Sequence, residues 1–97
     1  MSKPRVFVSR QIFAEAIDLI ASEADVEVWD DEMPPERSVL MDKVNGIDGL
    51  LCLLTDRVDA ELMDVAGESL KVVSQIAVGF DNIDIAEATR RGIPVGN

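Results

Sequence analysis

The chain has 97 residues, which is room for one folded domain and too little for two of ordinary size. Hydrophobic residues make up 47% of it and can form a core, while 19 acidic against 9 basic residues give a formal net charge of -10. This charge argues against nucleic acid as a partner and against docking on an anionic membrane, and no apolar segment reaches the roughly 18 residues of a membrane span.

The first half of the chain predicts two strands and two helices. Val6–Val8 is β-branched and aromatic, which is typical of a strand. Ser9 can cap a helix over residues 12–20, where apolar residues recur on one face. Residues 26–29 alternate in polarity as a second strand does, and a second helix over 35–44 starts with a proline in its first turn.

The second half predicts three more strands with two helices between them. The strands cover residues 49–54, 70–76 and 93–95, and the helices cover 59–66 and 85–91. Asp59 is the expected cap of the first of these helices. Asp84 and Glu87 have the spacing of a capping box at the start of the other.

Strands and helices thus alternate from one end of the chain to the other. Helical crossovers between short apolar strands predict an α/β fold with a parallel sheet and helices on both faces. Five strands of this kind fit a flavodoxin-like three-layer fold with strand order 2-1-3-4-5, and we treat residues 1–97 as one domain. Nothing follows the fifth strand to supply a last helix. Either an edge stays open, or a partner chain covers it, or the sequence is a piece of a longer protein, which is the alternative that we expect.

The absence of histidine excludes several chemistries. A Ser-His or Cys-His nucleophile pair, a histidine general base and a histidine metal site cannot be built from this chain. Cys52 is the single cysteine, so no internal disulfide forms and a reducing, cytoplasmic location is expected. It lies in the apolar run 50–54, which predicts a buried thiol and not a nucleophile.

Two ligand-binding patterns of parallel α/β folds are missing. No glycine spacing matches a nucleotide-binding fingerprint, so no cofactor site is predicted in the chain. A magnesium-binding phosphoacceptor domain needs an acidic pair after the first strand, where this chain has Ser9 and Arg10. Asp56 follows the third strand without such partners, and the acidic pair Asp30–Asp31 follows the second strand, where a solvated loop is the simpler interpretation.

The loop that contains Val78 and Gly79 is a candidate anion site. Glycine allows close approach to the backbone, and successive N–H groups in such a turn can bind a small carboxylate. The alternative is a glycine needed only for the turn, which the spacing by itself favours.

At this loop the sequence resembles a known family. The segment Leu70–Asp84, LKVVSQIAVGFDNID, and its continuation AEATRRGIPVGN resemble the D-isomer-specific 2-hydroxyacid dehydrogenases. Upstream, Gly49–Asp59, GLLCLLTDRVD, is similar to the glyoxylate and hydroxypyruvate reductase branch. The resemblance covers essentially the whole chain in order.

The resemblance implies a substrate domain of an oxidoreductase. Family members join a flavodoxin-like substrate domain to a Rossmann domain that binds NAD or NADP, and a small 2-oxo or 2-hydroxy acid binds between them. The matching positions imply that backbone amides at Val78 and Gly79 hold the substrate carboxylate, and that Leu53 and Leu54 line the pocket.

The resemblance also implies what this chain lacks. The family's cofactor glycines, its substrate-binding arginine, its glutamate and its acid/base histidine lie further along, so we predict no catalytic, cofactor-binding or metal residue here and no activity for the chain alone. A helix from the family's C-terminus, which completes the substrate domain, is also absent. We therefore expect exposed apolar surface and self-association into a homodimer, through exchange of a terminal element as one route. The alternative is a stand-alone or engineered module that binds a small anion or a protein.

Overall fold

The computed structural model describes residues 3–10, 14–31, 33–53, 55–75 and 81–96. Five strands form one parallel sheet in the order β2-β1-β3-β4-β5, as predicted. The strands are β1 (Arg5–Val8), β2 (Asp25–Val28), β3 (Gly49–Cys52), β4 (Val72–Gln75) and β5 (Val95–Gly96). The helices between them are α1 (Ala14–Ala21), α2 (Arg37–Val44), α3 (Ala60–Ala66) and α4 (Ile85–Arg90).

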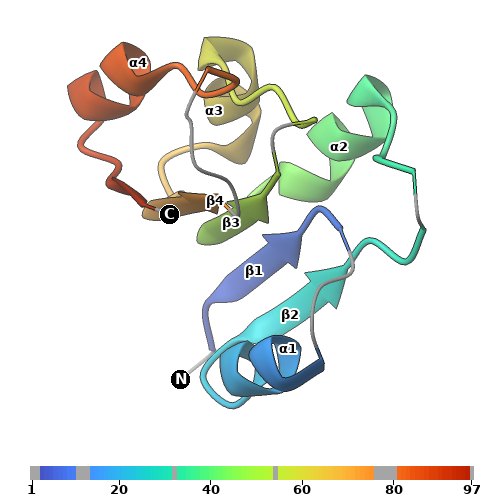
Figure 1. Cartoon of the computed structure of the whole chain (residues 1–97). Helices are drawn as coiled ribbons and strands as arrows, with labels where there is room; N and C mark the ends of the chain where they lie inside the picture. The colour runs from blue at the N-terminus through green and yellow to red at the C-terminus, as the bar shows by residue number, and fades with distance from the viewer. Residues whose placement is uncertain (1–2, 11–13, 32, 54, 76–80, 97) are drawn as a thin grey trace.

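The helices are divided unequally between the two faces of the sheet. Figure 1 shows α2, α3 and α4 side by side over one face and α1 by itself on the other. This follows from the strand order. The crossover from β1 to β2, which contains α1, runs in one direction across the sheet, and those from β2 to β3, β3 to β4 and β4 to β5 run in the other. Because all of them are right-handed, the two directions place their helices on opposite faces.

The hydrophobic core fills the layer between the sheet and helices α2 to α4. Alternate residues of the central strands point into it, and these are Phe7, Leu50, Cys52 and Val73. They pack against the buried faces of the three helices, whose contributions are Leu40 and Val44, Leu62, Met63 and Ala66, and Ala88. The indole of Trp29, just after β2, packs against the edge of this core and donates to the carbonyl of Met33 at 2.9 Å.

The sequence predicts both ends of α3 correctly. The Asp59 carboxylate accepts a hydrogen bond from the N–H of Leu62 at 3.0 Å, as a helix cap does. Gly67 follows the helix with φ of 83°, a left-handed value that a residue with a side chain rarely adopts. The residues that begin and end this helix are therefore those that the sequence predicts.

The capping box predicted for α4 is only half formed. Asp84 accepts from the N–H of Glu87 at 3.0 Å, but its own N–H donates to the carbonyl of Val58. The Glu87 carboxylate instead pairs with Arg90 and Arg91, which lower its pKa through their hydrogen bonds. Two cations near the end of the helix outcompete a backbone N–H for the carboxylate.

Three predicted boundaries are wrong by a few residues. Helix α2 begins at Arg37, not near Pro35, because the backbone of Glu36 is extended with ψ of 155°. Strand β4 begins at Val72, where the sequence predicts a start at Leu70, and β5 begins at Val95, where the sequence predicts a start at Ile93. Ile93 is buried beside α4 and its N–H bonds to the carbonyl of Ala88, so it belongs to the end of the helix. The predicted start of α1 lies outside the described residues, and with it the role of Ser9 as a cap.

Candidate functional site

The carboxyl ends of the central strands carry a set of buried polar side chains. Ser9, Asp56 and Gln75 follow or end β1, β3 and β4, and each is at most 2% exposed. They are the buried polar residues of the described part of the chain. Because a buried polar group is costly unless it has hydrogen-bond partners, their gathering at one edge needs a structural reason. This edge is also where parallel α/β sheets bind ligands.

Asp56 is the centre of this set. Its Oδ2 atom accepts from the hydroxyl of Ser9 and from the N–H of Leu53 at 3.0 Å. Its own N–H donates to the carbonyl of Leu53 at 3.0 Å, so Leu53 and Asp56 exchange two hydrogen bonds. The carboxylate thereby ties the end of β1 to the loop after β3.

Asn82 adds a second connection. Its Nδ2 atom lies 3.1 and 2.6 Å from the carbonyl oxygens of Leu53 and Asp56 and 2.6 Å from Oε1 of Gln75, so its two hydrogens are shared among three acceptors. Its backbone carbonyl accepts from the N–H of Val58 at 2.8 Å, next to a parallel bridge between Val58 and Ile83. The loop after β3 and the segment that leads into α4 are therefore joined by both side-chain and backbone hydrogen bonds.

Of the four predicted substrate-binding residues, the structure describes one. Leu53 lies in this polar set, half-buried, with both backbone polar groups hydrogen-bonded. Leu54, Val78 and Gly79 lie outside the described residues, so the predicted carboxylate site remains a prediction. In sequence, Val78 and Gly79 lie between Gln75 and Asn82, which are bonded to each other at this edge.

Sequence reasoning missed Ser9, Gln75 and Asn82 as members of this set and considered Asp56 only as a phosphoacceptor. The structure gives that carboxylate a serine and a backbone N–H as partners, where the phosphoacceptor hypothesis needs acidic ones. One signal was available, because Gln75 lies two residues after Val73 and therefore on the same face of the strand as this apolar residue. Its burial requires partners at the end of that strand.

Cys52 lies just below the polar set and is a core residue, as predicted. It is fully buried, and its Sγ atom is 3.6 Å from Oε1 of Gln75. Burial and the nearby negative charge of Asp56 raise the pKa of the thiol to about 12. The neutral thiol is a poor nucleophile.

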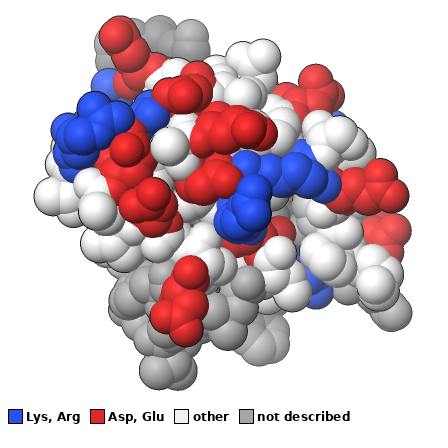
Figure 2. Space-filling model, turned by 90° about the horizontal axis from the view of Figure 1, so that it is seen from above, with Lys and Arg blue, Asp and Glu red and all other residues white. Residues whose placement is uncertain are grey.

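Arginines lie beside the loop after β3. A shallow pocket at this place is lined by Pro35, Arg37, Leu40, Thr55, Asp56 and Arg57. Arg37 contacts Oδ1 of Asp59 at 2.6 Å, and Nε of Arg57 contacts the other oxygen at 3.1 Å. Burial would raise the pKa of Asp59, but the hydrogen bonds from Arg37 and the Leu62 N–H outweigh it and lower that pKa. Figure 2, which views the face covered by α2 to α4, shows basic side chains lying among acidic ones.

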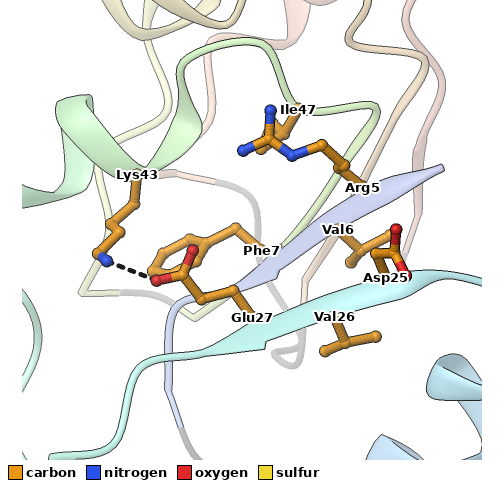
Figure 3. A pocket seen from close by; sticks show the side chains of 8 residues that line it. All are labelled: Arg5, Val6, Phe7, Asp25, Val26, Glu27, Lys43 and Ile47. Atoms are coloured by element: carbon orange, nitrogen blue, oxygen red, sulfur yellow. Dashed lines mark hydrogen bonds and ion pairs between the residues drawn. The ribbon is translucent and has the colours of Figure 1, made fainter.

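Another pocket opens on the α2 side of strands β1 and β2. Its lining is drawn in Figure 3 and includes Arg5, Asp25 and the ion pair of Lys43 with Glu27. The hydrogen bond from Glu27, together with its charge, raises the pKa of Lys43. The pair satisfies both charges within the protein, and the pocket contains none of the polar residues grouped around Asp56.

The described glycines with positive φ do not form a pyrophosphate-binding turn. The glycines with positive φ are Gly46, Gly67 and Gly92, and each follows a helix. A pyrophosphate-binding turn instead precedes a helix, whose N-terminus faces the phosphates. Over the same residues, no three acidic or thiol side chains gather in a way that could hold a metal ion. No described helix is both long and apolar enough to cross a membrane.

Comparison with known proteins agrees with the topology. The family model for the catalytic domain of D-isomer specific 2-hydroxyacid dehydrogenases matches residues 6–97. The chain belongs to this family. A glyoxylate reductase from Aeropyrum pernix is 50% identical over all 97 residues of the chain, which correspond to 29% of that protein.

Solved structures of other proteins have the same fold. A protein from Thermus thermophilus superposes with a TM-score of 0.86 at 38% identity, over 94% of this chain and 29% of its own. An NADPH-dependent glyoxylate/hydroxypyruvate reductase from Sinorhizobium meliloti, solved in complex with NADP and malonate, gives 0.73 at 23% identity, over 99% of this chain and 28% of its own. The chain thus spans less than a third of the length of these relatives.

Proposed function

We propose that this chain is the first part of the substrate domain of an NAD(P)-dependent oxidoreductase that acts on glyoxylate or hydroxypyruvate, and that it is inactive alone. The observation that carries the proposal is the 50% identity to a glyoxylate reductase along the whole chain. The same alignment leaves 71% of that protein unmatched, by subtraction of the 29% covered. In the proposal, the unmatched part supplies the cofactor site and the acid/base group.

In this proposal the chain contributes substrate binding. Backbone N–H groups at Val78 and Gly79 bind the carboxylate, and Leu53 and Leu54 form an apolar wall beside it. The part-buried hydrogen bonds of the Leu53 backbone support this role, because a pocket wall must keep its position when substrate displaces water. NAD or NADP would provide hydride transfer in the full-length protein.

Two measurements on the purified chain test the proposal. We expect glycolate to shift the amide NMR signals of Val78 and Gly79, whereas ethylene glycol, which lacks the carboxylate, leaves them in place. We also expect no NAD(P)H oxidation with glyoxylate. Measurable turnover by the chain would overturn the assigned inactivity, and glycolate shifts confined to other residues would overturn the assigned site. Glycolate shifts confined to other residues would favour a stand-alone module that binds anions or a protein elsewhere.

We also propose that the chain associates with a second copy through the α1 face of the sheet. Helix α1 has no buried residue, Leu19 is 74% exposed and Val72 on the same side is 40% exposed. Covering such apolar surface lowers the free energy of the associated state. Light scattering after size exclusion, at tens of micromolar protein, should give twice the chain mass, and the mass of one chain would contradict the dimer.

The lone buried thiol of Cys52 supports a reducing, cytoplasmic location.

A further inference from the structure

The backbone of Leu53 is held on both sides of the residue. Its N–H donates to Oδ2 of Asp56 at 3.0 Å, and its carbonyl accepts from the Asp56 N–H at 3.0 Å and from Nδ2 of Asn82 at 3.1 Å. One bond satisfies the N–H of Leu53 and one satisfies its carbonyl, so the bond from Asn82 is the additional one. Together the three bonds restrict where the backbone of Leu53 can lie.

The group that holds Leu53 is itself fixed. Asp56 is 2% exposed, and the oxygen that accepts from Leu53 also accepts from the hydroxyl of Ser9, which is fully buried after β1. Next to it, Nη2 of Arg10 donates to Oγ1 of Thr55 at 2.9 Å. Two successive residues after β1 thus hold two successive residues of the loop after β3. The position of Leu53 therefore depends on the sheet and not only on its own loop.

The same set includes the two residues that flank the second predicted substrate-binding segment in sequence. Asn82 donates to Leu53, Asp56 and Gln75, and Gln75 and Asn82 flank residues 76–81 in sequence. Movement of Leu53 would break the bond to Asn82, and movement of Asn82 would break bonds to both loops. Gln75 and Asn82 are therefore tied to the loop after β3.

We propose that Asp56 is a positioning residue for substrate binding: its carboxylate, held by Ser9, fixes the backbone of Leu53, the described residue of the proposed apolar wall, and Asn82 holds the same backbone from the other side. The proposal rests on the proposed function, which places Leu53 and the two amides around the substrate. Asp56 contacts no substrate in this account and acts through Leu53.

Three variants separate positioning from general stability. Asp56→Ala removes both acceptor bonds of the side chain. Asp56→Asn should retain them, since one oxygen accepts both bonds and an amide oxygen can do the same. Ser69→Ala is the matched control, because Ser69 donates to the carbonyls of Ile47 and Ala66, away from this edge of the sheet.

The measurements are amide hydrogen exchange and the glycolate dissociation constant, both by NMR on the full chain. In Asp56→Ala we expect exchange at Leu53 to rise roughly tenfold or more relative to the control variant, and glycolate to bind at least about fivefold more weakly. Asp56→Asn should restore both values to within about twofold of wild type. Ser9→Ala leaves the carboxylate in place and should cause smaller changes in the same direction, in both the exchange at Leu53 and the glycolate dissociation constant. This variant replaces Asp56→Ala in the experiment if Asp56→Ala does not fold.

The outcomes are distinguishable. Unchanged exchange at Leu53 in Asp56→Ala and Ser9→Ala overturns the positioning role, and so does an equal increase at all amides. Unchanged glycolate affinity together with faster exchange at Leu53 shows that Asp56 holds the loop without serving the ligand, which also overturns the proposal. If wild type does not bind glycolate, the proposed function fails, and exchange at Leu53 still decides whether Asp56 fixes this residue.

Discussion

The two faces of the sheet differ in how completely they are covered. On one face, α2, α3 and α4 pack against each other and against the sheet, and the core there is almost fully buried. On the other, α1 lies by itself, none of its residues is buried, and Leu19 and Val72 are exposed by 74% and 40%. Both faces belong to the same strands, so the difference comes from the helices.

This difference shows that a helix's own apolar content does not decide its burial. Helix α1, AEAIDLIA, is the more apolar sequence, whereas α2, RSVLMDKV, contains three charged residues. Yet α2 buries Leu40 and Val44 completely, because α3 lies beside it and closes the space. Burial depends on how many neighbours an element has, and α1 has neighbours only on one side.

The strongest test of the comparison is a matched pair of leucine truncations. Leu62→Ala on α3 removes a fully buried side chain, and we expect a loss of about 2–5 kcal/mol in the free energy of unfolding. Leu19→Ala on α1 removes an exposed side chain and should change it by less than about 0.5 kcal/mol. Urea unfolding followed by circular dichroism measures both, and equal losses would show that the two faces are equally packed.

A second test concerns the cap and ion pairs of α3. Asp59→Ala should cost about 1 kcal/mol at pH 7, because it removes the cap and leaves Arg37 without its main partner. In the folded chain the pKa of Asp59 lies below the ordinary value for an aspartate, which is near 4. The carboxylate therefore contributes fully to the stability of the fold at pH values above about 4. This contribution is lost as the pH falls through the pKa of the folded state. The stability difference between wild type and variant should therefore shrink from pH 7 to pH 2, and a difference that grows in acid would contradict it.

A smaller effect is expected when a methyl group is added on the α1 side. The added Cβ of Gly49→Ala would lie 3.4 Å from side-chain atoms of both Val6 and Val72. Since Val72 is partly exposed, it can adjust, and we expect a change below about 1 kcal/mol. A loss above about 2 kcal/mol in the same urea assay would show that this face is as closely packed as the other.

The smallest effect on stability is expected from Leu19→Glu. We expect the free energy of unfolding to change by less than about 0.5 kcal/mol, since the side chain is in solvent in the single chain. The same change should lower the proportion of dimer measured by light scattering, because a carboxylate resists burial against apolar surface. A dimer that persists unchanged would place the contact elsewhere.

The strand order could be predicted because the apolar pattern alternates clearly between strand and helix, and crossover handedness leaves few arrangements. The network around Asp56 could not be predicted in the same way. Its bonds join residues 47, 29 and 26 positions apart, and nothing local signals which polar side chains meet. The prediction of a capping box at α4 was half wrong for a related reason, since Arg90 and Arg91 compete for the Glu87 carboxylate. Leu53 was identified only through the family resemblance.

Trp29 gives the molecule a built-in optical reporter. It is the single tryptophan, the chain has no tyrosine, and its indole lies beside β2, which is an edge strand. Its fluorescence therefore follows the edge of the sheet, whereas far-ultraviolet circular dichroism follows the helices. If the two signals change at the same denaturant concentration, the β2 edge unfolds together with the packed core. If fluorescence changes first, β2 detaches first, and the chain contains two units of different stability.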